Sequence, residues 1–444
     1  MLPESSTVPL TPTQNWLFER ELQDPHNYNL AWLYKLPANV EFDLLEESLV
    51  AAYRHHKCDL LRYSRDGDLW TQSYGGSLPI TIDYVDTSGV PAGYESQFIV
   101  TKAVEYRRSL NLTCGPLGRA VLFKFTDNSC PLLLWVVSHL IWDGRSQSIF
   151  IACVESIYHY RTNGGKKSLR TTQHFFADWA RHFYRYGQLD STIDLTDYWC
   201  SQRWVEIQSM ADGALEFENT YEESSILSVA LPGSLCDKLR RCVPRLLYAQ
   251  STAAVLAAVS EALCKWTKAS LCAMDMTVDG RTRMFNELDV RHSIGYYTVH
   301  WPLLVDLTSC KEASVRRSIM QIWGQYLEAF RHGPSFGALR YLCEDDRIRC
   351  AMAQIPDLEI KFNYLEGNTP RPQSDKLLIP SAEKIGGVLA PNNRRKYILN
   401  IEIRNHLTAM DISIKYNRIL HKEEQISHLL FQITSFLNRV VHDC

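Results

Sequence analysis

The sequence has no surplus of charge of either sign. Its 444 residues include 47 basic and 50 acidic side chains, which gives a formal net charge of -3 at pH 7, and the two kinds are interspersed. Proteins that bind nucleic acid or an anionic membrane through their electrostatic field carry a basic patch or stripe. The composition therefore argues against both kinds of partner.

Long apolar runs are also absent. A run such as that around residues 132–137 is far shorter than the ~20 residues that a membrane-spanning helix needs. The first residues, Met-Leu-Pro-Glu-Ser-Ser-Thr, lack the basic and then apolar character of a secretory signal. We therefore expect a soluble protein.

Metal-binding cysteine patterns are missing as well. The 13 cysteines form no Cys-x-x-Cys pair, and no histidines stand at the spacing of a zinc site. An odd number of dispersed cysteines is typical of buried thiols in a reducing compartment. We expect a cytoplasmic protein without a bound metal.

What the sequence does contain is the composition of a large folded protein. Apolar residues make up 45% and charged residues 22% of the chain, and a chain of this length is expected to form more than one core. Apolar spacing predicts helices over 41–57, 146–160, 251–266 and 423–441. Strands are predicted at 120–125, 131–137, 271–277 and 296–307, and a hairpin turn at 66–68.

One turn between a strand and a helix carries the residues of chemical interest. The apolar run 131–137 is typical of a strand that is buried on both faces. His139 and Asp143 follow it, before the helical pattern that begins at Ser146. An imidazole at the exit of a buried strand is held firmly and titrates near neutral pH, as a general base must. A satisfied core histidine is the alternative reading of His139.

Asp143 reads as a structural residue of the same turn. A carboxylate beside Gly144 can pair with a buried guanidinium and so hold the loop, and Arg62 is the predicted partner. Removing one partner of such a pair costs about 3 to 5 kcal/mol.

Beyond this turn, the chain resembles the condensation-domain superfamily of nonribosomal peptide synthetases at several ordered places. The family signature His-His-x-x-x-Asp-Gly is matched at His139, Asp143 and Gly144, with Ser138 in place of the first His. The opening stretches 9–18 and 25–29 are similar to those of the epimerization subgroup. Further matches cover nearly the whole chain: Leu60-Leu61-Arg62, Gly115-Pro116-Leu117, Ile294-Gly295-Tyr296-Tyr297-Thr298, Trp301-Pro302, Phe336-Gly337-Ala338-Leu339-Arg340-Tyr341-Leu342 and Phe362-Asn363-Tyr364-Leu365.

The resemblance implies an α/β (α+β) fold of two chloramphenicol-acetyltransferase-like lobes, 1–185 and 186–444, in a V-shaped pseudo-dimer with a central tunnel. It also implies His139 as the catalytic base for condensation-type acyl transfer. The substrate would be a thioester on the phosphopantetheine arm of a carrier protein or synthetase module, with no cofactor of the chain's own. Trp142, Tyr296, Asn363 and Tyr364 are candidates for the wall of the substrate tunnel or, equally, for structural positions.

The chain departs from the epimerization subgroup at one position. That subgroup has a functional Glu in a Glu-Gly-His-Gly-Arg segment, and Thr277 stands at the matching place. A hydroxyl is a poor acid and base, so the departure argues against amino-acid epimerization.

The pattern of Ser138, His139, Asp143 and Ser146 instead resembles the terminal, cyclizing condensation domains of fungal synthetases. Ring-closing release is therefore a second form of the predicted acyl transfer. The alternative interpretation is that Ser138 is a tolerated replacement of the first His of the signature.

Two other readings remain. A coenzyme A-dependent acyltransferase of the plant type would share His-x-x-x-Asp-Gly, but the chain lacks the Asp-Phe-Gly-Trp-Gly segment of that family. A repurposed scaffold that binds its ligand without acyl transfer is the other reading. The sequence identifies neither the donor nor the acceptor substrate.

Overall fold

The computed structural model describes residues 6–443 except 21, 23, 59, 76–78, 92, 126–129, 165–171, 212–218, 248–249, 282–283, 286, 311–313, 367–375, 384, 386–392 and 407–408. The chain forms two compact units, each made of several stretches of sequence. The first comprises Met1–Arg185, Asp279–Thr298 and Arg371–Ala390, and the second comprises Tyr186–Val278, Val299–Pro370 and Pro391–Cys444.

Among its described residues, the first unit forms two sheets and five longer helices. Its elements are β1 (Ser6–Val8), α1 (Pro12–Glu19), η1 (Pro25–Asn27), β2 (Asn29–Lys35), α2 (Phe42–His55), β3 (Leu61–Asp66), β4 (Leu69–Tyr74), β5 (Thr81–Asp86), α3 (Glu95–Arg108), β6 (Gly118–Lys124), β7 (Leu132–Ser138), η2 (His139–Ile141), α4 (Gly144–Asn163), α5 (Phe176–Tyr186) and β12 (Ile379–Pro380). Strands β12, β2, β7, β6 and β5 form one sheet in that order, and β1, β4 and β3 form the other.

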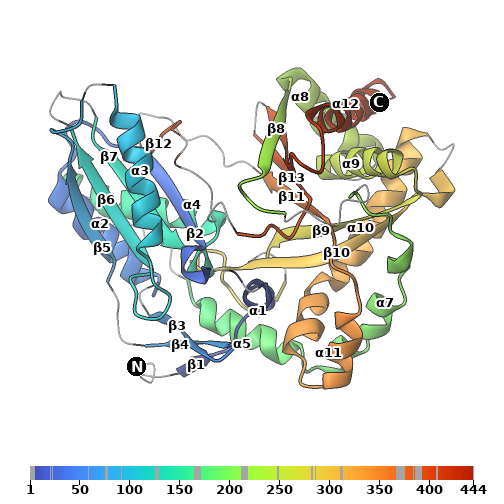
Figure 1. Ribbon diagram of the computed structural model, residues 1–444, viewed down its shortest axis with the longest axis horizontal. Coiled ribbons are helices and arrows are strands. Elements are labelled where there is room, and N and C mark those ends of the chain that lie inside the picture. Colours follow the sequence, from blue (N-terminus) through green and yellow to red (C-terminus); the bar gives the residue numbers. More distant parts are fainter. Residues whose placement is uncertain are drawn as a thin grey trace. The chain divides into compact units, whose positions relative to one another are not determined.

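Strand β7 lies at the centre of the five-stranded sheet and is buried on both faces. On one face, Leu134 and Val136 belong to a core cluster with Ile99 of α3, which lies along the sheet in Figure 1. On the other face, the Trp135 ring stacks on Phe150 of α4 at 4.6 Å between ring centroids. The continuous apolar run of β7 thus fills two cores at once.

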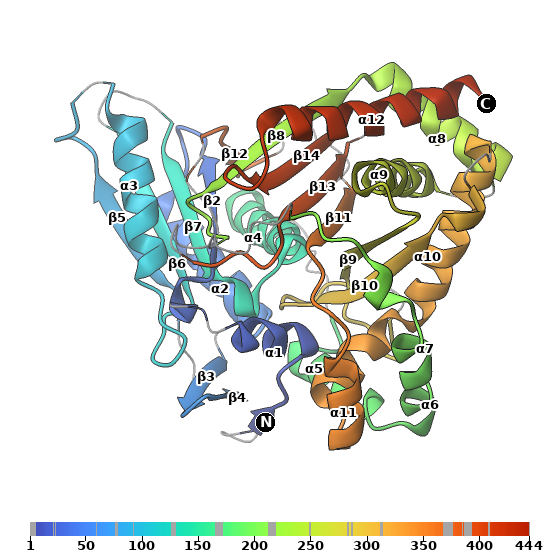
Figure 2. The same ribbon diagram turned by 45° about the vertical axis from the view of Figure 1, so that its right-hand side comes forward.

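The second unit is built on a single mixed sheet with strand order β10-β9-β11-β13-β14-β8. Its elements are α6 (Asp190–Ile193), α7 (Thr196–Cys200), η3 (Trp204–Glu206), β8 (Ser224–Leu231), α8 (Gly233–Leu247), α9 (Ser251–Thr267), β9 (Leu271–Asp279), β10 (Thr298–Asp306), η4 (Thr308–Cys310), α10 (Val315–Gly337), the π-helical turn η5 (Ala338–Leu342), α11 (Asp346–Ala353), β11 (Ile360–Glu366), β13 (Leu399–Asn405), β14 (Met410–Asn417) and α12 (Glu423–His442). Figure 2 shows α12 extending past β8 and β14, with α9 beside it.

The structure confirms most predicted elements. The helix predicted over 423–441 is α12, and its predicted stripe Ile426, Leu429, Leu430, Ile433, Phe436 and Leu437 is buried. The predicted hairpin turn connects β3 to β4, with Gly67 at a φ of 58°. The fold class is the predicted mixture of helices and sheets, whereas the V-shaped arrangement with its tunnel stays a prediction.

The division of the chain differs from the predicted one in two segments. Residues 279–298 and 371–390 were assigned to the C-terminal lobe, but both belong to the first unit. Strand β12 explains the second assignment, because it pairs antiparallel with β2. Residues 279–298 are linked to the rest of this unit by the ion pair of Arg281 with Asp143. None of the described helices has the length and apolar composition to cross a membrane.

Candidate active site

The turn between β7 and α4 is short and capped by its own side chains. Ser138 Oγ accepts a hydrogen bond from the backbone N–H of Leu140 at 3.4 Å at the start of the turn. Asp143 is the N-cap of α4, where its Oδ1 accepts from the backbone N–H of Ser146 at 2.8 Å. Such caps satisfy N–H groups that a helix start leaves without partners. The turn is therefore fixed at both ends.

His139 lies in this turn with its ring orientation fixed. Its backbone N–H donates to the carbonyl oxygen of Tyr28 at 2.9 Å, and its ring Nδ1 lies 2.6 Å from the carbonyl oxygen of Trp142. Because a carbonyl oxygen only accepts, Nδ1 must carry the hydrogen. In the neutral ring the lone pair is then on Nε2. His139 is half-buried, not sealed in the core.

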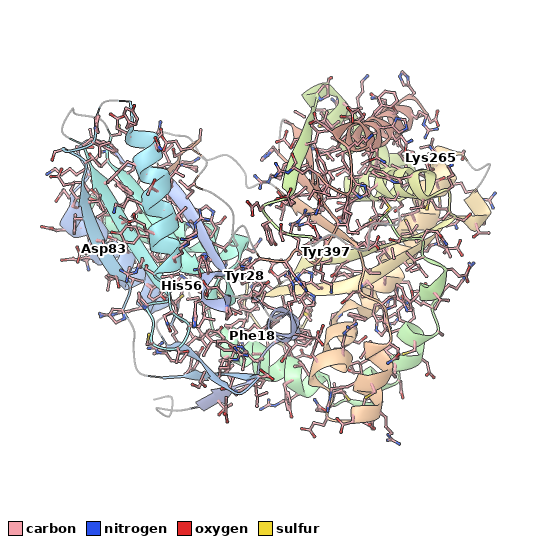
Figure 3. All side chains as sticks on the ribbon, viewed as in Figure 1. Phe18, Tyr28, His56, Asp83, Lys265 and Tyr397 are labelled. Atoms are coloured by element: carbon pink, nitrogen blue, oxygen red, sulfur yellow. The ribbon has the colours of Figure 1, made fainter. Side chains whose placement is uncertain are left out.

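Two tyrosines pack against the His139 ring. Tyr28 stacks on it with 4.7 Å between centroids and 13° between planes, and the centroid of Tyr296 lies 4.6 Å away. The two phenol oxygens are 3.1 Å apart and share a hydrogen bond. Burial, followed by the influence of Tyr28, raises the pKa of Tyr296. Both rings limit the rotation of His139. Figure 3 labels Tyr28, just before β2.

The carboxylate of Asp143 is almost fully saturated with hydrogen bonds. Besides the two donors of Ser146, it accepts from the backbone N–H of Tyr297 at 3.1 Å. Arg281 contacts it through two nitrogens, at 2.7 and 3.0 Å. Burial alone would raise the pKa of Asp143, but the charge and hydrogen bonds of Arg281 lower it below its ordinary value. The predicted partner Arg62 is wrong, because Arg281 occupies that role.

Arg281 is only 4% exposed and uses every nitrogen of its guanidinium. Nε donates to the Ser293 carbonyl oxygen at 2.9 Å, and Nη1 also reaches Asp279 Oδ1 at 3.0 Å. Its Cζ lies 4.1 Å from the centroid of the Tyr297 ring. Burial lowers its pKa, but the charges of Asp143 and Asp279 outweigh that effect and raise it. This network binds residues 279–298 to the first unit.

The two serines of the motif have structural contacts. Ser138 and Ser146 are both fully buried. The oxygen of Ser146 accepts from Arg281 Nη2 at 2.7 Å and from the Gly295 N–H at 3.1 Å. Gly144 is exposed, and a Cβ there would meet no atom within 4 Å. Gly295 is the glycine that close packing requires, because its Cβ would lie 2.6 Å from Phe176.

The four residues predicted to line a tunnel differ in their burial and contacts. Trp142 is completely buried, with its indole N–H donating to Gln147 Oε1 at 3.0 Å, so its assignment to a tunnel wall is wrong and it is a core residue. Tyr296 contacts His139. Asn363 and Tyr364 are half-buried on β11 of the second unit. For these three residues the role in substrate binding stays a prediction.

Thr277, which matches the position of the epimerization Glu, lies beside titratable groups of the second unit. Its Oγ1 is 3.3 Å from His300 Nδ1, and His300 Nδ1 is 3.7 Å from Asp275 Oδ1. Tyr397 also hydrogen-bonds Asp275. Burial lowers the pKa of His300, and the nearby carboxylate of Asp275 opposes this effect. The neutral ring is thus favoured.

Sequence reasoning missed three residues that hold the turn. Arg281 and Tyr28 are two, and Gln14 is the third, with its Nε2 3.2 Å from the Leu140 carbonyl oxygen. Arg281 had a signal, since a buried Asp143 requires a cation and Arg281 closes a stretch matched to the family. Tyr28 and Gln14 lie in the stretches that resemble the epimerization subgroup, but no local pattern links them to His139.

Among the described residues, no group of three or more His, Cys, Asp or Glu side chains is placed to hold a metal ion. The turn itself offers the His139 imidazole and the groups that orient it. Its arrangement suits a proton acceptor at Nε2.

Comparison with known proteins identifies relatives along the whole chain. A family model described as "Condensation domain" matches residues 4–444. One component of the linear gramicidin synthase of Brevibacillus parabrevis is 27% identical over 448 residues, which cover 98% of this chain and 8% of that protein. Gramicidin S synthase 1 of Brevibacillus brevis is 21% identical, and the match covers 98% of this chain and 40% of that protein. The chain thus spans a small part of these relatives.

Solved structures show the same fold. The epimerization domain from the third module of a tyrocidine synthetase superposes with a TM-score of 0.89 at 21% identity, covering 99% of this chain and 97% of that one. The first condensation domain of the calcium-dependent antibiotic synthetase, in complex with a substrate analogue, gives a TM-score of 0.71 at 15% identity, covering 99% and 97%. With the family match over nearly its full length, the chain belongs to the condensation-domain family.

Proposed function

We propose that this chain transfers an acyl group from a carrier-bound thioester to an amine or hydroxyl, with His139 as the general base. The observation that carries the proposal is the fixed imidazole, whose Nδ1 is engaged by the Trp142 carbonyl oxygen. Nε2 would accept the proton of the nucleophile as it attacks the thioester carbonyl. When the tetrahedral intermediate collapses, the C–S bond breaks and the proton passes to the thiolate.

The surroundings of His139 support this role. The paired Tyr28 and Tyr296 restrict the ring, and the Asp143–Arg281 ion pair fixes the turn below it. A base held in one orientation loses little freedom in the transition state. In this proposal the phosphopantetheine arm of a carrier protein delivers the thioester, and Asp143 and Arg281 are positioning residues.

The test is intact-mass analysis of a loaded carrier protein before and after addition of the enzyme and a candidate nucleophile. In His139→Asn, the amide nitrogen can still donate to the Trp142 carbonyl oxygen, but the basic Nε2 is removed. We expect the rate of product formation to fall about 10²- to 10⁴-fold. His159→Ala, at an exposed residue of α4, is the matched control and should retain full activity. An unchanged rate in His139→Asn would contradict the proposal.

The same assay separates two forms of the reaction and a scaffold. Intermolecular condensation leaves or releases a product that contains both reactants, whereas ring-closing release yields a product lighter than the hydrolysed acid by one water. Ser138 and Ser146 do not favour ring closure over condensation, because both serve the turn. A chain that binds loaded carriers but turns none of them over would instead be a scaffold.

A second candidate function is epimerization, and one contact favours it. Thr277 lacks the acid–base ability of Glu, but it lies beside His300, whose Nδ1 is 3.7 Å from Asp275 Oδ1. His300 could supply the second proton-transfer group. Incubation of an aminoacyl carrier in D₂O tests this: epimerization predicts deuterium at Cα that disappears in His300→Asn, and no incorporation excludes it.

A further inference from the structure

A second feature of interest lies in the second unit, at the approach to β13. The segment 393–397 is fixed there by hydrogen bonds to Asn219. Asn219 Nδ2 donates to the carbonyl oxygens of Arg395 and Tyr397, both at 3.0 Å. The Arg395 N–H donates to the Asn219 carbonyl oxygen at 2.5 Å. The backbone of Arg395 is therefore held at a defined place beside the end of β14.

The guanidinium of Arg395 is buried without a negative partner. Arg395 is 5% exposed, and within the described part of the chain no carboxylate forms an ion pair with it. Its Nη2 makes two long contacts, to the carbonyl oxygens of Ile398 at 3.4 Å and Lys415 at 3.3 Å. Its Nη1 is buried with no hydrogen-bond partner among the described residues. Buried charges are normally paired, because desolvation costs several kcal/mol for each ion.

A second cation lies beside the first. Lys415, on the face of β14 opposite Ile412 and Ile414, is half-buried and has no ion pair among the described residues. Its Nζ lies 5.6 Å from the centroid of the Tyr221 ring, and Arg395 Cζ lies 6.0 Å from the same ring. Burial, and then the charge of Arg395, lowers the pKa of Lys415. The two side chains therefore repel each other.

The carboxylate that acts on Lys415, and that of Glu223 two residues after Tyr221, are both engaged elsewhere. Glu402 raises the pKa of Lys415, but its Oε1 is 2.7 Å from Arg404 Nε. Glu223 forms an ion pair with Arg418 at 2.9 Å. Two cationic side chains thus lie near the same Tyr221 ring, and no described acidic group forms an ion pair with either of them.

We infer that Arg395 and Lys415 form a binding site for a phosphate group, either as free phosphate or as a phosphate monoester of a larger ligand. A phosphate carries about -1.5 to -2 charges at neutral pH, which matches two cations, whereas a carboxylate would neutralise only one. The Arg guanidinium offers a planar pair of donors and the Lys ammonium a mobile point charge. The site is formed by residues of the second unit and does not depend on the proposed acyl transfer.

Calorimetric titration at pH 7.5 tests the inference with inorganic phosphate, glycerol 3-phosphate and acetate at matched ionic strength. The protein should bind phosphate saturably at one site, and acetate should not compete. Arg395→Met and Lys415→Met should each weaken phosphate binding on the order of tenfold or more. Lys265→Met is the control, because Lys265 is an exposed residue of α9 beside Glu261 (Figure 3).

The two phosphate ligands distinguish the source of the group. Equal or tighter binding of the monoester indicates a phosphate on a larger ligand, and binding of inorganic phosphate alone indicates the free ion. Either supports the site. Absence of saturable binding, competition by acetate as strong as by phosphate, or unchanged affinity in both variants would overturn it. Thermal unfolding without phosphate is the folding control, and if Arg395→Met does not fold, Lys415→Met at a half-buried residue decides.

Discussion

Replacing Arg281 by Met should destabilise the protein more than almost any other single change in the first unit. The variant leaves Asp143 buried, 6% exposed, without the two nitrogens that now contact it at 2.7 and 3.0 Å. Removing one member of a buried ion pair costs about 3 to 5 kcal/mol. We expect the free energy of unfolding, measured by urea denaturation at pH 7, to fall by about that amount.

The pH dependence of this loss has a definite sign. In the native protein the pKa of Asp143 is lowered, so its ion pair contributes stability above the unfolded pKa, and this contribution is lost as the pH falls through the folded pKa. Without Arg281, burial dominates and raises that pKa. The variant then gains stability relative to its unfolded state as the carboxyl group is protonated. The difference between the two proteins should therefore shrink from pH 7 to pH 5.

Two further variants make this test decisive. Arg62→Met removes the cation that the sequence suggested, and it should change the free energy of unfolding by no more than about 1 kcal/mol. Asp143→Asn combined with Arg281→Met removes both charges and should recover part of the loss. If Arg62→Met costs as much as Arg281→Met, or if Arg281→Met costs less than about 1 kcal/mol, the assignment of the ion pair is refuted.

Three other changes follow from the packing. Gly295→Ala should lower the free energy of unfolding by about 1 to 3 kcal/mol, because the new Cβ would lie 2.6 Å from Phe176; a fully stable variant would count against this packing. Gly144→Ala meets no atom within 4 Å and should fold as stably as the parent protein in the same assay, so a clear loss would show a need for glycine there. His56 is 4% exposed, and burial lowers its pKa to about 3. Between pH 7 and pH 5 only the unfolded state then binds a proton at His56, so the free energy of unfolding should fall by about 2 kcal/mol over this range. In His56→Leu the free energy of unfolding should fall less over the same pH range. A fall equal to that of the parent protein would exclude His56 as the cause.

The parts of the site that sequence could predict are local ones. The buried run before His139, the helical spacing after Ser146 and the carboxylate of Asp143 between them are all within one short stretch, and the structure has them as β7, α4 and the N-cap. The partner of Asp143 was beyond such reasoning, because Arg281 lies 138 residues away. Nothing in the spacing of Arg62 or Arg281 reveals which of the two comes close.

The degree of burial of a side chain was the second property that the sequence could not predict. An indole beside the histidine proposed as the base is as consistent with a substrate wall as with a core, and the sequence alone does not rank the two. In the structure Trp142 packs between Trp135 and Phe150, with 5.6 and 5.1 Å between ring centroids, and this fills the space behind the turn. Tyr296, which was predicted in the same terms, contacts His139 instead.

The mixed origin of the first unit has a consequence for biosynthesis on the ribosome. Domains generally fold as units while the chain emerges from its N-terminus, but the first 185 residues do not contain Arg281 or Gly295. The loop that carries His139 can acquire its final set of contacts only after residue 298 has left the exit tunnel. A fragment truncated at 185 would therefore keep the contacts of His139 with Tyr28 and Trp142 but lose Tyr296 beside the ring and Arg281 beside Asp143.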